Sequence, residues 1–317
     1  MMWYDAFIET VNKKYPKRSK MIKELMELLS LEREAVYRRL RKEVHFSAQE
    51  IVMIASSWSL SLDEITGINV GKVTFQMRTM NYLEPSKDEV GFLRYVIHSI
   101  DYLKNFPTTE FMDICNKLPR QLLAGYDYLN KFHLFKWLYQ YGNKKGPISF
   151  SNTTISEEKS NIAKEYYHAI KQVPNNSFIF DSKIFDYLVS DIKYFCSINL
   201  ITEKEKELIK KDLQDLLEYL WEVANKGYYP ETKNKVNLYI SQLKVDTGYS
   251  YTFTPDINIC YIHVFEKFQI YSFHTEMVAN FMTWMQLKKR TSVKISEVDE
   301  RSRIEFFTQQ QELINSL

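Results

Sequence analysis

SKMIKELMELLSLEREAVYRRLRK, residues 19–42, is the stretch that decides the fold of the N-terminal part of the chain. Its pattern predicts two short amphipathic helices that meet at a tight turn near Ser30. Ser19 is in a position to cap the first of them. The second is expected over about residues 32–42, and the spacing of Ala35, Val36 and Leu40 turns these three side chains inward.

The outward side of this second predicted helix is basic. It carries Arg33, Glu34, Tyr37, Arg38 and Arg41, with Arg39 and Lys42 nearby. A core helix would not contain five basic side chains in ten residues, and an ordinary surface helix mixes both signs along its length. Cations on such a helix can neutralise phosphates, and the fork of an arginine side chain matches O6 and N7 of guanine. The pattern therefore predicts a helix-turn-helix that places this helix in the major groove of DNA.

Three further helices are expected around this pair. One covers residues 3–14, and the others begin at the capping boxes Ser47-x-x-Glu50 and Ser61-x-x-Glu64. Five helices in about 65 residues form a complete small domain. The basic residues between 13 and 20 either belong to a solvated loop or contact a phosphate backbone, and the sequence leaves both interpretations open.

Residues 19–67 resemble the Cro/C1-type helix-turn-helix, the lambda-repressor-like or XRE family. The residues that carry the resemblance are Leu25, Leu28, Leu31, Val36, Ser47, Ile51, Ile54-Ala55 and the closing run Leu60-Ser61-Leu62-Asp63-Glu64-Ile65. The resemblance covers roughly a fifth of the chain. It implies a five-helix domain in which the third helix is the recognition helix. Ser30 and Lys42-Glu43 stand where the family often has glycine, and Glu32 stands where it usually has Ser or Thr.

The residues expected to contact DNA combine this resemblance with the charge pattern. In the family, the early exposed positions of the third helix touch bases, and these positions are held here by Arg33, Glu34 and Arg38, with Tyr37 between them. The full predicted set is Ser19, Lys20, Arg33, Glu34, Tyr37, Arg38, Arg41 and Lys42.

The remainder of the chain predicts a larger, mainly α region. We expect a linker at 68–85, a helical region at 86–228 and an α+β region at 229–317 with a small antiparallel sheet, or a single domain over 86–317. The expected strands are 236–245, 249–254, 257–265 and 268–273, and residues 110–116 are ambiguous between strand and helix. The long helix after Ser86 is expected either to make a dimer contact or to pack on the next domain.

Composition excludes several classes of protein. The net charge of +2 is small, so a nucleic-acid-binding surface has to be local. Three separate cysteines and the lack of a long apolar stretch predict a cytoplasmic protein with no disulfide framework and no membrane segment. The common phosphate-loop, dinucleotide, zinc-protease and hydrolase motifs are absent from the sequence, so we expect no enzyme activity, no cofactor and no metal. Arg301 and Arg303, with Lys288-Lys289-Arg290, could form a pocket for an anion or a solvated charged face.

Two functional hypotheses follow. In the first, the protein is a sequence-specific transcriptional regulator that binds double-stranded DNA as a homodimer. Its C-terminal region then serves dimerisation or the sensing of an unidentified small molecule or protein partner. In the second, the helix-turn-helix is only a scaffold within a partner-binding or ligand-binding protein, with an enzyme as the weaker variant of that alternative.

Overall fold

The computed structural model describes residues 3–14, 18–58, 60–66, 73–77, 85–142, 146, 148–264 and 268–317; of these, the side chains of 64 and 85–88 are not described. The chain divides into two compact units, Met1–Val73 (unit 1) and Thr74–Leu317 (unit 2). Overall, the protein is mainly helical and contains one sheet. In the described parts of the chain, no helix is both long enough and apolar enough to cross a membrane.

Unit 1 is built from short helices around one apolar core. The helices are α1 (Trp3–Lys13), α2 (Arg18–Leu29), α3 (Arg33–Leu40), α4 (Ala48–Trp58) and α5 (Leu62–Thr66). Phe7, Leu25, Val36 and Ile54 are completely buried in the core, and they come from four different helices. Burial of apolar side chains at helical spacing holds these helices together, because helices this short are marginal alone in water.

Unit 2 is organised by an eight-stranded mixed sheet in the order β1-β7-β6-β5-β2-β3-β4-β8. The strands are β1 (Gln76–Met77), β2 (Glu110–Cys115), β3 (Asn175–Asp181), β4 (Lys235–Ser241), β5 (Tyr249–Phe253), β6 (Asn258–Val264), β7 (Phe268–Ser272) and β8 (Ser292–Lys294). β2, β3 and β4 run parallel in the middle, and every other pairing is antiparallel.

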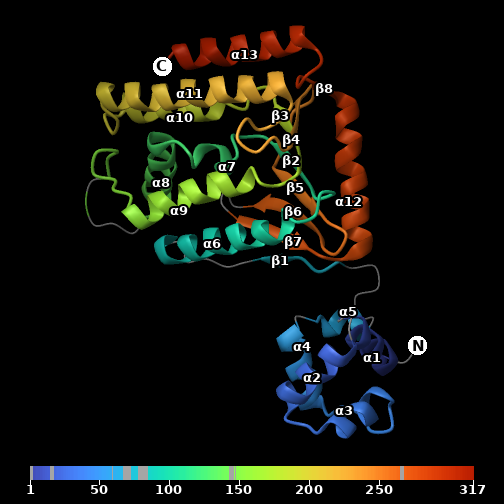
Figure 1. Cartoon of the computed structure of the whole chain (residues 1–317). Helices are drawn as coiled ribbons and strands as arrows, with labels where there is room; N and C mark the ends of the chain where they lie inside the picture. The colour runs from blue at the N-terminus through green and yellow to red at the C-terminus, as the bar shows by residue number, and fades with distance from the viewer. Residues whose placement is uncertain are drawn as a thin grey trace. The chain divides into compact units, whose positions relative to one another are not determined.

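Helices cover both faces of this sheet (Figure 1). They are α6 (Pro85–Leu103), α7 (Arg120–Leu123), α8 (Asp127–Tyr141), α9 (Glu157–Ile170), α10 (Asp186–Ser197), α11 (Glu203–Lys226), α12 (Thr275–Lys288) and α13 (Glu300–Asn315). Phe178 and Phe180 of β3 pack in the large core with α8, α10, α11 and α13. Ile179, between them, faces the opposite way and packs with α12. The alternation of side chains along a strand thus divides the sheet into two cores.

The small antiparallel sheet predicted within 229–317 is confirmed in part: β5, β6 and β7 pair antiparallel as expected, but they belong to a larger sheet. Its centre is parallel, and two central strands, β2 and β3, lie inside the segment predicted to be helical. The reason is that central parallel strands are covered on both faces and lack the alternation that marks a half-exposed strand. In β3, Phe178 and Phe180 face one core and Ile179 faces the other, so this run shows no alternation of apolar and polar side chains.

Local sequence signals predicted the ends of helices and single strands more reliably than the order of strands in the sheet. A capping box formed by Thr202 and Glu205 opens α11, and Gly227 ends that helix in the left-handed conformation, with φ 72°. The alternating strand Tyr249–Phe253 was also confirmed. Residues 266–267, between the expected strands 257–265 and 268–273, lie outside the described residues, as does the side chain of Ser86.

Candidate nucleic-acid interface

The turn between α2 and α3 sets the direction of α3. Ser30 ends α2 with φ 51°, and the amide of Leu31 donates to the carbonyl of Met26 at 3.1 Å. This is the Schellman closure, which needs one residue in the left-handed region. Glu32 then adopts an extended conformation before α3 but makes no side-chain capping bond. The turn therefore forms with serine at a position that favours glycine.

The end of α3 repeats this arrangement. Lys42 has φ 64°, and the amide of Glu43 donates to the carbonyl of Arg38 at 2.9 Å. The two positions where the family often has glycine, Ser30 and Lys42, thus both have left-handed backbone here. Side chains other than glycine pay about 1–2 kcal/mol for this conformation. The sequence therefore forms both of these helix ends at a cost in stability.

The helix α3 presents a mostly charged outer side. Val36 and Leu40 are buried, as predicted, and Ala35 is half-buried. Arg33, Glu34, Arg38, Arg41 and Lys42 are exposed, and Tyr37 is half-buried. The charged predicted DNA-contacting positions therefore point away from the core of unit 1, whereas Tyr37 packs against that core.

The beginnings of α2 and α3 meet at Tyr37. Cζ of Arg33 lies 5.7 Å from the centroid of the Tyr37 ring, and Cζ of Arg18 lies 5.9 Å from it. Such stacking restricts the rotamers of a guanidinium without neutralising its charge. Among the described residues, no acidic side chain forms an ion pair with Arg33 or Arg18. We name Arg18, Arg33 and Tyr37 the stacked cluster.

The other cations of α3 are paired within unit 1. Arg41 bonds Glu34 at 2.7 Å and Glu43 at 2.8 Å, Arg38 lies 3.6 Å from Glu43, and Lys42 pairs with Asp5. Of the acidic partners, Glu43 and Asp5 lie outside α3, so the sequence of α3 by itself does not reveal these ion pairs. Residues 1–73 contain twelve Lys and Arg against ten Asp and Glu, so the uncompensated charge is small and local.

Arg39 serves the fold. Its guanidinium binds Glu50 with N···O distances of 2.9 and 3.1 Å, and both side chains are less than one fifth exposed. Glu50 also closes the predicted capping box, because it accepts from the amide of Ser47 at 2.7 Å while Ser47 Oγ accepts from the amide of Glu50. Burial alone would raise the pKa of Glu50, but the bonds from Arg39 and Ser47 outweigh it and lower the pKa.

The beginning of α2 supplies further exposed polar groups. Because α2 begins at Arg18, Ser19 lies inside its first turn and does not cap it, contrary to the prediction. Ser19 and Lys20 are both exposed there. Arg18 was noted in sequence only as one of several basic residues near the turn. Its place beside Tyr37 depends on the packing of α2 against α3, and no local pattern reports that contact.

The described part of unit 2 contains hollows of different size. One is a groove of about 390 Å³ between α6 and α9, lined by Arg94, His98, Asp101 and Glu158 among others, and Arg94 pairs with Glu158 at 2.7 Å. Another is a cavity of about 20 Å³ beside the Glu89–Arg120 ion pair, about the size needed for one water molecule. In the described parts of the chain, no three His, Cys, Asp or Glu residues come together to hold a metal.

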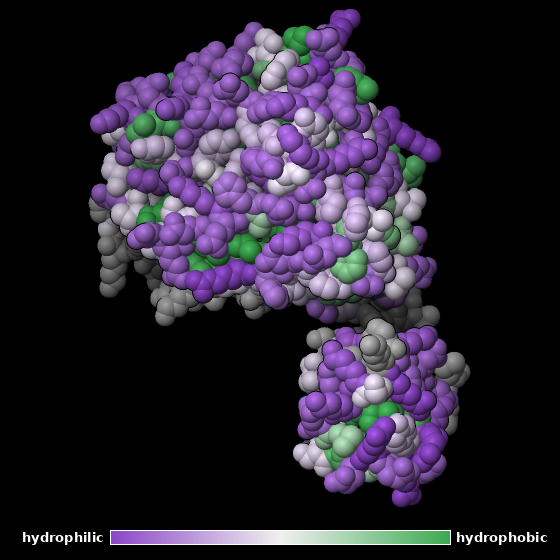
Figure 2. Space-filling model, in the orientation of Figure 1, coloured by the Kyte–Doolittle hydropathy of each residue, from purple (hydrophilic) through white to green (hydrophobic). Residues whose placement is uncertain are grey.

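The surface of unit 2 shows no large apolar patch among the described residues on the face that Figure 2 draws. On the face drawn in Figure 2, hydrophilic residues predominate and hydrophobic ones occur in small separate groups. α6 packs against α9, which agrees with one of its two predicted roles and leaves the dimer role untested.

Comparison with family models, curated proteins and solved structures finds no match for this chain.

Proposed function

We propose that this protein is a sequence-specific, DNA-binding transcriptional regulator of the Cro/C1 type, with α3 as the helix that enters the major groove. The observation that carries the proposal is the stacked cluster: two guanidiniums from the starts of α2 and α3 lie beside one aromatic ring and form no ion pair with an acid of the described residues. Arginines that are held in place before binding lose less conformational entropy when they reach a base or a phosphate.

The internal ion pairs of unit 1 let us rank the predicted DNA-contacting residues by the contribution that we expect from each. Arg33 stands at the first position of α3, where a recognition helix reaches base edges, so we assign it a base contact. Arg18 and Lys20, at the start of α2, are assigned to phosphates. Arg41 and Lys42 would have to exchange an internal acid for DNA, which lowers their net contribution.

A dimer completes the proposed mechanism. Two copies of α3 related by a two-fold axis would read half-sites about 34 Å apart in successive major grooves, and the operator would be palindromic. Unit 2 is the larger part of the chain and would carry dimerisation or the sensing of an effector.

One specific observation favours the alternative, in which the helix-turn-helix is a scaffold. Most cations of α3 are already neutralised by Asp5, Glu34, Glu43 and Glu50. A scaffold of this kind predicts only weak, sequence-independent attraction to DNA.

Selection from a pool of random duplexes by the full-length protein, followed by sequencing of the retained fraction, separates the two. The regulator predicts an enriched palindrome whose half-sites are about one helical turn apart. Retention without any enriched sequence, lost as salt is raised, would contradict the proposal and support the scaffold.

A further inference from the structure

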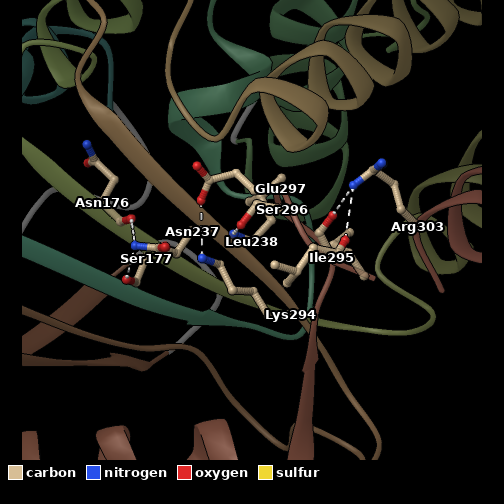
Figure 3. A network of polar contacts seen from close by, with 10 residues as sticks. Asn176, Ser177, Asn237, Leu238, Lys294, Ile295, Ser296, Glu297 and Arg303 are labelled. Atoms are coloured by element: carbon tan, nitrogen blue, oxygen red, sulfur yellow. Dashed lines mark hydrogen bonds and ion pairs between the residues drawn. The ribbon is translucent and has the colours of Figure 1, made fainter. Parts of the chain in front are cut away.

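A polar area lies on the α12 face of the sheet, where β3, β4 and β8 run side by side. Phe178 and Leu238 point into the core on the other face, so the alternating residues Ser177, Asn237 and Tyr239 point to this one. Lys294 of β8 is the cross-strand partner of Tyr239 and shares its face. Figure 3 shows Ser177, Asn237 and Lys294 on these neighbouring strands.

The end of α12 brings a further cation to this area. Lys289 follows α12 directly, and its Nζ lies 5.5 Å from the centroid of the Tyr239 ring. Burial lowers the pKa of Lys289, and Lys294 and Lys235 lower it further, whereas Glu110 acts in the opposite direction. No carboxylate of a described residue lies within ion-pairing distance of Lys289. Lys289 and Lys294 are half-buried and Lys235 is exposed, so three lysines here face two carboxylates, those of Glu110 and Glu297.

The neutral donors beside the lysines are poorly satisfied. Asn237 Nδ2 lies 3.5 Å from both the carbonyl of Asn176 and Oγ of Ser177, at the outer limit of a hydrogen bond. Lys294 reaches Glu297 only at 3.3 Å, in an exposed pair of little strength. An amide, a hydroxyl and ammonium groups are therefore available to a better acceptor.

We propose that Lys235, Lys289, Lys294 and Asn237 form a binding site for a small anion that carries a phosphate or carboxylate group. Such an anion would offset the repulsion among the lysines and accept charge-assisted hydrogen bonds from them. The site shares only Lys289 with the pocket that the sequence suggested. Arg303 is buried and donates to the carbonyls of Ile295 (3.0 Å) and Val298 (3.3 Å), so it is committed to the fold (Figure 3).

The inference is independent of DNA binding, and its test uses no DNA. The full chain is acetylated briefly with limiting acetic anhydride, and the rate at each lysine is read by mass spectrometry. Inorganic phosphate or citrate is added at matched ionic strength, with sodium chloride as the reference. Lys244, an exposed lysine paired with Asp246 at 3.6 Å, is the internal control.

The site predicts that one or both anions protect Lys289 and Lys294 but not Lys244. Protection of Lys289 should reach about tenfold at an anion concentration ten times the dissociation constant. The choice between phosphate and citrate identifies the preferred group. Equal slowing at all lysines, or none with either anion, would overturn the proposal.

A variant pair checks the assignment by a second readout. Phosphate or citrate, whichever protects, should raise the melting temperature of the wild type and of Lys244→Met. It should raise that of Lys289→Met much less. Equal stabilisation of all three proteins would place the anion elsewhere and refute the site.

Discussion

Arg33 stands one helical turn before Tyr37 on α3, and its Cζ lies 5.7 Å from the centroid of the Tyr37 ring. The cation lies beside the ring at the start of the helix, and no acidic side chain in the described parts of the chain pairs with it. Arg41, the residue that caps the end of the same helix, bonds both Glu34 and Glu43. This contrast between a stacked and a paired arginine underlies the first prediction.

Arg33→Ala should weaken binding to the selected operator by about 1–3 kcal/mol and relax the preference at one position of each half-site. Arg41→Ala is the matched control, because it removes an arginine that is already neutralised and should cost less. Fluorescence anisotropy on the operator and on its single-base variants measures both. An equal loss for the two variants would show that only overall charge matters.

Lys20→Ala tests a phosphate contact. Lys20 is exposed in the first turn of α2. Its loss should weaken binding by the same factor on every duplex and reduce the slope of log Kobs against log salt by about 0.9. The slope is obtained from titrations at several salt concentrations. A sequence-dependent loss would reassign Lys20 to base readout.

The left-handed residues predict a gain in stability. Ser30→Gly should stabilise the α2–α3 region by about 0.5–1 kcal/mol, because glycine relieves the strain at φ 51° and this gain exceeds its larger unfolding entropy. Ser56→Gly, in the interior of α4, should destabilise by a similar amount. Hydrogen exchange of the full chain, read over unit 1, reports both. The same sign for both variants would show that the turn is unstrained.

The Arg39–Glu50 pair predicts a pH dependence. The pKa of Glu50 is lowered in the folded state, so its contribution is present above the ordinary value of 4.5 and is lost as pH falls through the lowered pKa. Glu50→Gln retains the capping box and removes the charge. It should cost about 1–3 kcal/mol at pH 7, and the difference from wild type should shrink toward pH 3. A difference independent of pH would refute the ionic role.

Local structure could be predicted well from the sequence, whereas long-range structure could not. Periodicity and capping residues located most helices, since both signals lie within one element. The sheet was underestimated because β2 and β3 are covered on both faces and are paired with strands far away in sequence. The order of strands is a property of contacts that no single segment encodes.

The candidate site shows the same division. The exposure of Arg33 and Arg38 followed from helical spacing, but the pairing of Arg41 and Lys42 depends on Glu43 and Asp5, which lie outside α3. Similarly, the proposed anion site joins Asn237, Lys289 and Lys294 from three elements. Charge patterns along a segment predict which residues face solvent, whereas packing decides which of them stay unpaired.

The specificity ratio tests the central claim most directly. It is the dissociation constant of the full-length protein for a scrambled duplex divided by that for the most enriched duplex, measured by fluorescence anisotropy at one physiological salt concentration. The account predicts a ratio of about 10³ or more for the wild type, and a ratio lower by about tenfold for Arg33→Ala. Equal dissociation constants for the two duplexes would contradict it and leave the helix-turn-helix as a scaffold.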